Sequence, residues 1–328
     1  METIELQQRF FAHLKSILPP HLSLADELGD LLGLSADSVY RRMRGEKPLT
    51  LTELKLICDQ YRLSLDQVLQ LQNESVLFAA PGMSRPPGRH IDYMNEMIGQ
   101  FRYFRSFRAG QIHYLCKDAP FWYFYLFPGI AAFKTFFWSR TINNQPELAD
   151  QLFSLEEYPY EDCFAAGQQI LQLHSTLNSV ELWNLESIHS TINQIAYYRD
   201  AGIFRSRGDL EAVADSFRQM LDHLQQQAEK GVKFMPGSGD AGGSIEFYVN
   251  ELILGNNTIL LTLDGQRVSM ITYSVLNYLI TKDDRFAGKA FETFHTLLSR
   301  SSLISRSGEK ERSRFFNTLR EKVGQLKK

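Results

Sequence analysis

Residues 21–69 read HLSLADELGDLLGLSADSVYRRMRGEKPLTLTELKLICDQYRLSLDQVL, and this stretch decides the fold of the first part of the chain. Ser23 is placed to cap a short helix with leucines at helical spacing, which stops at Gly33, a residue suited to the left-handed conformation. Ser35 then caps a second short helix that ends at Gly45. The pattern predicts a helix-turn-helix.

The second helix of this motif presents a candidate recognition surface. Val39 and Met43 lie four residues apart and therefore share the face that turns toward the core. The residues that point mostly away from the core are Ala36, Asp37, Tyr40, Arg41 and Arg44. Basic side chains are concentrated here, since residues 41–47 carry four basic side chains and one acidic side chain.

A third amphipathic helix follows, capped by Thr50 or Thr52, and a further apolar segment covers residues 63–69. Its apolar residues are Leu54, Ile57, Cys58 and Tyr61, and the N-terminal residues expected to pack with them are Phe10, Phe11, Leu14 and Ile17. Together these segments predict a small helical core.

Residues 24–28 (LADEL), 33–35 (GLS), 39–48 (VYRRMRGEKP) and 63–66 (LSLD) resemble phage-repressor-type DNA-binding domains of the Xre or Cro/CI-like kind, over about a fifth of the chain. The resemblance implies that the helix from Ser35 to Arg44 enters the major groove of double-stranded DNA, which is also the general docking rule for the motif. It places Ala36, Asp37, Tyr40 and Arg41 nearest the base edges, and Ser35, Arg42, Arg44 and Lys47 nearer the phosphates, with Ser38 in the same expected DNA-binding set. The chain departs from the family at Arg42, where many relatives carry a buried apolar residue.

Charge leaves two interpretations of this motif open. The first 80 residues hold 8 basic and 11 acidic side chains, so the domain as a whole is not basic. Phosphate neutralisation is a local event, however, and the basic cluster at residues 41–47 favours DNA binding. The alternative is a protein-interaction adaptor that uses the helix-turn-helix fold for protein contacts.

The whole chain has the composition of an ordinary soluble globular protein. Its 328 residues are 44% hydrophobic, which predicts two or three units and a sizeable second core. Three cysteines without paired spacing argue against a disulfide framework or a metal site and fit a reducing, cytoplasmic compartment. The longest uncharged apolar run, residues 119–133, is broken by Pro128 and Gly129, so we interpret it as core and expect no membrane segment.

A segment rich in proline and glycine separates two parts of the chain. Residues 79–89 contain three of the eleven prolines, and the predicted organisation is a DNA-binding domain over 1–78, a linker over 79–90 and a larger domain over 91–328. Apolar residues from Ile91 to Phe104 then predict a helix whose apolar stripe is a candidate dimer seam. Arg102, Arg105 and Arg108 form a neighbouring basic stripe, expected as a solvated face or as a further phosphate or acidic-partner contact.

The larger domain is predicted to be α+β, in a chain that is mainly α, with helices packed on a small antiparallel sheet. Expected helices cover residues 146–155, 160–177, 180–198, 209–230, 285–300 and 309–326, and expected strands cover 111–116, 245–254, 258–264 and 266–273. Residues 121–138 are so rich in aromatic side chains that they must be buried. The segment 117–138 also looks similar to the bodies of uncharacterised Bacteroidetes-type regulators, a resemblance that implies no ligand.

No motif in the larger domain indicates catalysis or a cofactor site. Gly237, Gly239 and Gly242 have dinucleotide-loop spacing, but they follow a helix and precede a strand, the reverse of the required order. Glu186 and His189, one helical turn apart, are expected to be structural together with nearby His174 rather than metal ligands.

Ser305, Arg306 and Ser307 form a weaker candidate anion site, since they lead into a basic helix whose free N–H groups favour negative charge. The alternative at these residues is plain helix capping beside a solvated basic helix.

These observations predict a bacterial, sequence-specific transcriptional regulator. A single small DNA-binding domain rarely has the affinity typical of specific DNA sites, so we expect a homodimer on DNA. The larger domain is expected to dimerise or to sense an effector that the sequence does not identify.

Overall fold

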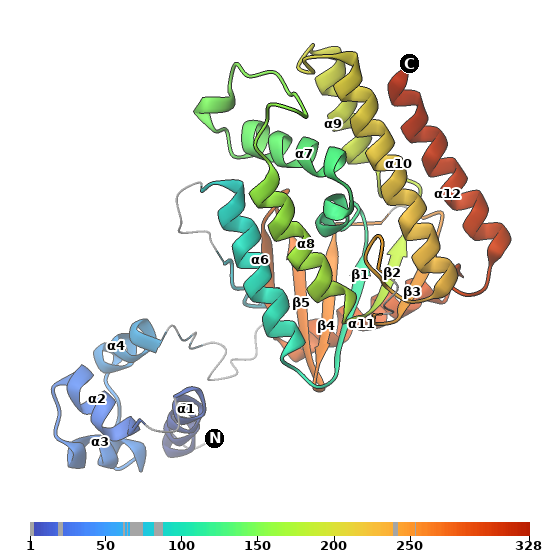
Figure 1. Cartoon of the computed structure of the whole chain (residues 1–328). Helices are drawn as coiled ribbons and strands as arrows, with labels where there is room; N and C mark the ends of the chain where they lie inside the picture. Colours follow the sequence, from blue (N-terminus) through green and yellow to red (C-terminus); the bar gives the residue numbers. More distant parts are fainter. Residues whose placement is uncertain are drawn as a thin grey trace. The chain divides into compact units, whose positions relative to one another are not determined.

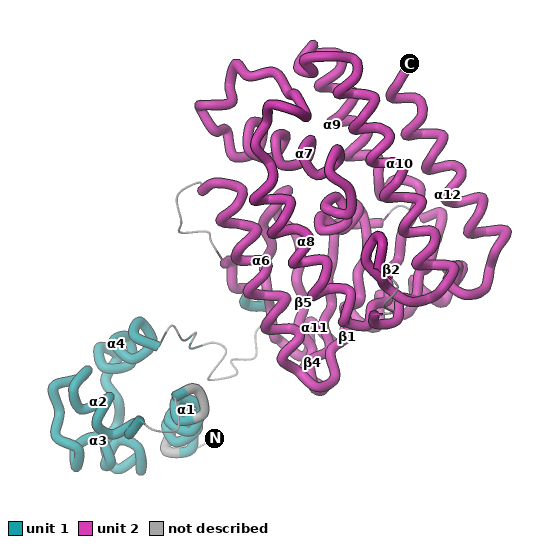
Figure 2. The backbone as a smooth tube through the Cα atoms, in the orientation of Figure 1, with its two compact units in different colours: residues 1–77 teal, residues 78–328 magenta. Residues whose placement is uncertain are grey.

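The computed structural model describes residues 3–18, 22–61, 63, 65, 75–81, 88–238, 242–252 and 254–328. The chain forms two compact units, unit 1 over residues 1–77 and unit 2 over residues 78–328 (Figure 2). Each unit has its own hydrophobic core. Most of the predicted segment 63–69 and the middle of the predicted linker 79–90 lie outside the described residues.

Unit 1 is helical over its described residues, with α1 (Thr3–Ile17), α2 (Leu24–Leu32), α3 (Ala36–Met43) and α4 (Leu51–Tyr61) (Figure 1). Its fully buried apolar side chains come from all four helices and are Phe10, Phe11, Leu14, Leu24, Ala25, Leu28, Val39 and Ile57. The predicted helical core is therefore confirmed, apart from the side chain of Ile17, which lies outside the described part of α1.

Unit 2 is built on a seven-stranded mixed sheet of order β6-β5-β4-β1-β2-β3-β7. The strands are β1 (Gly110–Leu115), β2 (Asn178–Trp183), β3 (Ile245–Val249), β4 (Thr258–Leu263), β5 (Gln266–Thr272), β6 (Tyr278–Thr281) and β7 (Ser302–Leu303). β1, β2 and β3 are parallel, whereas β4, β5 and β6 continue from β1 as an antiparallel meander. The expectation of a small antiparallel sheet is wrong in size and in strand direction. Of the antiparallel meander expected over 245–254, 258–264 and 266–273, only the pairing of β4 with β5 is as expected, because β3 pairs in parallel with β2.

The sequence analysis did not predict strand β2, and this explains the error. Residues 180–198 were expected to form one helix, but they contain most of β2 followed by the separate helix α9 (His189–Asp200). β2 is buried on both faces, and a short buried run lacks the alternation that would distinguish a strand from a buried helix. Similarly, only Pro146–Leu148 of the helix expected over 146–155 is helical, as one 3₁₀ turn.

The helices of unit 2 form layers on the two faces of the sheet. They are α6 (His90–Arg105), α7 (Pro128–Phe137), α8 (Glu161–Ser175), α9, α10 (Arg207–Lys230), α11 (Asp284–Leu298) and α12 (Glu309–Gly324) (Figure 1). Trp183 on β2 packs into the large core beneath α6, α7, α8 and α10, while Val180 and Leu182 pack with Phe291 and Phe294 of α11 on the other face. The alternation along β2 therefore places its odd-numbered residues, including Glu181, under the helical layer.

The start of unit 2 lies earlier than the sequence suggests. The rings of Phe78 and Phe286 pack with centroids 5.2 Å apart, and Ala79 pairs with Ile280 beside the sheet. The structure thus assigns both ends of the predicted linker to unit 2, since His90 already begins α6.

The apolar stripe of α6 is internal. Its residues Met94, Ile98 and Phe101 are buried in the core of unit 2, so the stripe does not provide the expected dimer seam. The aromatic segment 121–138 is likewise buried, as predicted. Among the described residues, no helix combines the length and apolar character that a membrane crossing requires.

Candidate nucleic-acid interface

The turn between α2 and α3 fixes how the second helix is presented. Gly33 ends α2 with a φ of 65°, and its N–H donates to the carbonyl of Gly29. This left-handed conformation is strained for residues with a Cβ, which explains the glycine. Ser35 then caps α3, because its Oγ accepts a hydrogen bond from the N–H of Ser38 at 3.4 Å.

The outer face of α3 carries most of the residues predicted to meet DNA. The exposed ones are Ser35, Ala36, Asp37, Tyr40, Arg41, Arg44 and Lys47, and Ser38 is half-buried. Tyr40 is 46% exposed, and the side chains of Arg41 and Arg44 are 53% and 55% exposed. Val39 is buried beneath this face. The structure therefore gathers an aromatic ring, two guanidinium groups and a lysine on one side of unit 1.

Arg42 is the exception and corrects the sequence-based prediction. It is only 3% exposed, and its Nη2 donates to Glu53 Oε1 at 2.7 Å while its Nη1 donates to the carbonyl of Ser38 at 3.0 Å. With its donors occupied inside the unit, Arg42 is not placed to contact a phosphate. It is instead one half of a buried ion pair.

Glu53 joins this pair to the start of α4. Its Oε2 accepts from the N–H of Thr50 at 2.9 Å, and Thr50 Oγ1 accepts from the N–H of Glu53 at 3.2 Å, which is a capping box. Although desolvation by burial would raise the pKa of Glu53, the hydrogen bonds from Arg42 and Thr50 lower it. Glu53 thus stays ionised and locks α3 to α4.

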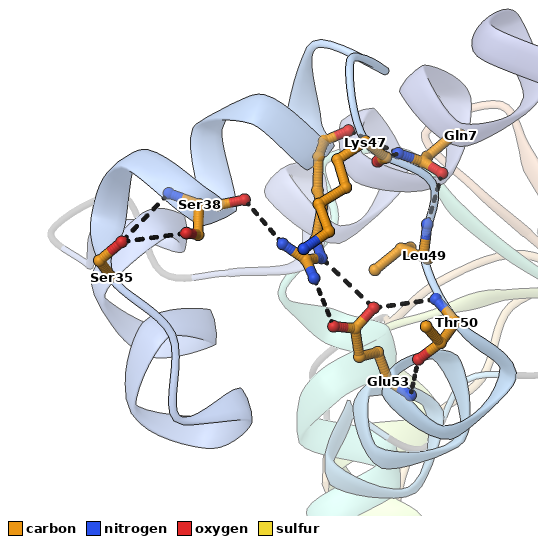
Figure 3. A network of polar contacts seen from close by, with 8 residues as sticks. Gln7, Ser35, Ser38, Lys47, Leu49, Thr50 and Glu53 are labelled. Carbon is orange, nitrogen blue, oxygen red and sulfur yellow. Dashed lines mark hydrogen bonds and ion pairs between the residues drawn. The ribbon is translucent and has the colours of Figure 1, made fainter.

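Gln7 of α1 holds the segment between α3 and α4 (Figure 3). Its Nε2 donates to the carbonyls of Arg42 and Lys47 at 2.7 and 2.8 Å, and its Oε1 accepts from the N–H of Leu49 at 2.9 Å. One amide side chain therefore bonds three backbone groups, one at the end of α3 and two in the segment that leads to α4. This fixes the backbone from which Arg44 and Lys47 project.

Glu46 shields the two exposed arginines. It lies 2.5 Å from Arg44 Nε and 3.6 Å from Arg41 Nε. The hydrogen bond from Arg44 lowers the pKa of Glu46, and the same bond raises the pKa of Arg44. Exposed ion pairs of this kind are weak, so a phosphate can replace Glu46 as the partner of either arginine.

The comparisons with known proteins bear on this unit. Residues 15–88 match the BetR domain family. This family is a helix-turn-helix-like DNA-binding domain, and the match covers α2, α3 and α4. Neither a curated protein nor a solved structure shows significant similarity to the chain. The match suggests a DNA-binding regulatory domain at residues 15–88, which fits the coarse prediction from sequence.

The candidate anion site near α12 is not assembled as expected. Ser305 is buried, and its Oγ accepts from the N–H of Phe247 at 3.1 Å. The backbone N–H of Arg306 donates to the carbonyl of Ala228 at 2.9 Å, and Ser307 is exposed. Two acidic residues, Glu309 and Glu311, occupy the first turn of α12, where they already complement the helix dipole. The three residues therefore do not converge on one point.

The other sequence candidates occupy structural positions. His174 is 1% exposed and its Nε2 lies 3.9 Å from Glu181 Oε1 inside the core of unit 2. Glu186 and His189 form a surface pair at 3.5 Å. Within the described ranges, no group of three or more His, Cys, Asp and Glu side chains could hold a metal ion. Gly239 lies outside those ranges, so the predicted glycine spacing is not described.

Sequence reasoning missed Gln7 and Glu53, which position the interface. Thr50-Leu51-Thr52-Glu53 has the spacing of a capping box, so the role of Glu53 at the start of α4 was accessible from sequence. The contacts of Gln7 span 35 to 42 residues and had no local signal.

Proposed function

We propose that the chain is a sequence-specific transcriptional regulator that acts in the cytoplasm of a bacterium and inserts α3 into the major groove of DNA. The observation that carries the proposal is the exposed face of α3, with Tyr40 and Arg41 at its centre and Arg44 and Lys47 beside it, inside a match to a DNA-binding domain family. The resemblance to phage-repressor-type domains supports the same docking.

The exposed residues divide by chemistry into two roles. Ala36, Asp37, Tyr40 and Arg41 lie on the helix itself and are proposed to meet base edges, where an arginine reads guanine most specifically. Ser35, Arg44 and Lys47 flank the helix and are proposed to contact phosphates, which position the protein without reading sequence. Arg42 has no part in contact and instead stabilises the unit that presents them.

We further propose that two copies bind one operator. Two copies of unit 1 related by a two-fold axis would place their α3 helices about one turn of duplex apart, on the order of 34 Å. A single copy with a few contacts rarely has the affinity typical of specific DNA sites. The apolar stripe of α6 is buried inside unit 2. We therefore propose that the two copies associate through another surface of unit 2 or by cooperative binding to the DNA itself.

The test is selection of duplexes from a random pool with the full-length protein, repeated with Arg41→Ala. We expect an enriched motif with two-fold symmetry, and a loss of about tenfold or more in affinity in the variant, since a bidentate base contact contributes on the order of 1–3 kcal/mol. Arg314→Ala, which removes an exposed arginine of unit 2, is the matched control and should bind like wild type. Absence of any enriched motif at low salt would refute the proposal.

The salt dependence of binding separates this function from the protein-adaptor alternative. Phosphate contacts release counterions, so affinity for DNA should fall steeply as the salt concentration rises. In a plot of log affinity against log salt concentration, Lys47→Ala should make the slope shallower by about one, the contribution of one phosphate contact. An apolar protein contact would show little dependence on salt.

A further inference from the structure

A cavity of about 330 Å³ lies in unit 2 at the carboxyl edge of the parallel strands. The loop after β1 contributes Asp118, α7 contributes Lys134, and α9 contributes Gln194. The segment between β5 and β6 supplies the outer wall, where Tyr273 is 45% and Val275 is 56% exposed. In open α/β sheets this edge is where ligands bind, and the volume lies within the usual range for small-molecule sites.

Lys134 is a buried cation that forms no direct ion pair among the described residues. It is 3% exposed, and its Nζ donates to Gln194 Oε1 at 2.7 Å and to Thr191 Oγ1 at 3.3 Å. The Nζ also lies 4.4 Å from the ring centroid of Phe124 and 4.7 Å from that of Trp138. Desolvation lowers the pKa of Lys134 to about 7. The hydrogen-bond and ring partners are all neutral, and Asp118 only partly opposes this fall in pKa, so the ammonium form would gain from a further anion in the cavity.

Asp118 is the complementary charge on the same cavity. Burial raises the pKa of its carboxyl, and the charges of Lys117 and Lys134 and the hydroxyl of Ser190 oppose that rise. The backbone N–H of Asp118 donates to Asn257 Oδ1 at 2.9 Å, which fixes the residue beside the cavity. Across the part of the chain that the structure describes, Asp118 and Lys134 form no ion pair with one another. Two opposite charges therefore border one space and act on each other electrostatically without forming a direct ion pair.

The rest of the wall is largely aromatic. Phe121, Trp122, Phe124, Trp138 and Tyr278 line the cavity together with a few apolar side chains. The indole N–H of Trp138 is buried without a hydrogen-bond partner among the described residues, so one donor of this wall is unused. Such a wall favours a flat, apolar group beside the two charges.

We propose that this cavity binds a small zwitterion with an aromatic side chain, of the aromatic α-amino acid class. The ligand carboxylate meets Lys134, its ammonium meets Asp118, and its ring packs against the aromatic wall. A ligand with one charge would leave the opposite charge of the cavity unpaired, which is costly in a buried site. The site would give the proposed regulator a small-molecule input, but the binding itself does not depend on DNA.

The experiment is isothermal titration calorimetry on the full-length protein without DNA, with L-phenylalanine, L-tyrosine and L-tryptophan as probes. L-Alanine removes the ring, 3-phenylpropionate removes the ammonium, and phenethylamine removes the carboxylate. We expect at least one of the three aromatic amino acids to bind, and each of the other probes to bind at least tenfold more weakly.

Two cavity variants locate the site. Asp118→Asn keeps the shape of the side chain and Lys134→Met keeps most of its length, and each should weaken binding by tenfold or more. The matched controls Asp150→Asn and Lys282→Met change exposed residues that do not line the cavity and should bind like wild type. Circular dichroism and tryptophan fluorescence confirm that each variant is folded.

Three outcomes would overturn the proposal. They are the absence of binding by all three aromatic amino acids at millimolar concentration, equal binding of 3-phenylpropionate or phenethylamine, and unchanged binding in folded Asp118→Asn. Because no DNA is present, a failure here leaves the proposed DNA binding untouched, and a failure of duplex selection leaves this site untouched.

Discussion

Lys233 and Lys134 are both buried in unit 2, and burial lowers the pKa of each, yet they have different surroundings. Lys233 faces Glu181, whose carboxylate accepts hydrogen bonds from Tyr123 at 2.6 Å and from Trp183 at 2.9 Å. Lys134 donates hydrogen bonds only to neutral groups, and the carboxyl that acts on it electrostatically, Asp118, lines a cavity together with it. Burial of a charge is therefore not in itself a sign of function. The informative difference is whether the opposite charge is enclosed in the core, as at Glu181, or borders a cavity, as at Asp118.

The largest expected effect comes from removing Lys233, the cation that faces the buried carboxylate of Glu181. Lys233→Met leaves Glu181 buried without a cation, and removal of one partner of a buried pair typically costs about 3–5 kcal/mol. Urea unfolding followed by tryptophan fluorescence measures this in unit 2, since Trp122, Trp138 and Trp183 all lie there. Glu181→Gln combined with Lys233→Met removes both charges and should recover part of the loss. Lys310→Met, at an exposed lysine, is the control, and a Lys233→Met loss no larger than in this control would contradict the comparison.

Unit 1 extends the comparison to a second paired cation. Arg42→Met removes the partner of Glu53, and because Glu53 is only partly buried we expect a smaller cost, about 2 kcal/mol. Hydrogen exchange measured by mass spectrometry should show reduced protection in α3 and α4. Arg41→Met, one residue away but exposed, should leave protection unchanged and weaken only DNA binding. Equal exchange in the two variants would show that Arg42 has no special structural role.

These two arginines also show how far sequence reasoning reaches. The caps Ser23 and Ser35 and the turn at Gly33 were predictable because each depends on residues within four positions. The burial of Arg42 depends on Glu53, eleven residues away on another helix. The helical pattern placed Arg41 but not Arg42 on the outward face, and only the resemblance to phage-repressor-type domains put Arg42 near the phosphates. The hairpin of β4 and β5 consists of two β-rich runs separated by the turn signal Asp264-Gly265, and it was found, whereas β3, expected in the same meander, pairs with β2 and β7.

The cavity had no comparable signal. Asp118, Lys134 and Gln194 are separated by 16 and 60 residues, and they meet because the parallel pairing of β1 and β2 brings the carboxyl ends of these strands together. That pairing was itself missed, because β2 was taken for part of a helix. A site built from a wrongly predicted strand could not be derived from the chain.

The pH dependence of stability tests whether the buried lysines lose their protons on folding. The pKa of Lys134 in the folded protein is about 7, below its unfolded value of 10.5, so between these values the unfolded chain binds more protons. Stability of unit 2 should therefore rise from pH 7 to pH 9, by up to about 1.4 kcal/mol per pH unit for each such lysine. The charged or titratable neighbours of Lys134 are Asp118, whose pKa burial raises, and His90, whose pKa burial lowers to about 3, well below this range.

Urea unfolding at several pH values measures this slope, and Lys134→Met should reduce it while Lys282→Met should not. A slope of zero in the wild type would mean that Lys134 stays protonated in the folded protein. A slope that persists unchanged in Lys134→Met would assign the whole effect to Lys233.

The smallest expected effect is the stability change in Lys134→Met at pH 7. Methionine removes the cost of holding a buried ammonium without an anion, but it also removes the donor to Gln194 and Thr191. Gln194 borders the cavity and can accept from water there, so the two effects should nearly cancel, and we expect a change within about 1 kcal/mol. The contrast with Lys233→Met is the decisive measurement, because both substitutions replace a fully buried lysine with the same side chain. A loss as large as that in Lys233→Met would mean that Lys134 is held for stability, and its place beside the cavity would then need no ligand to explain it.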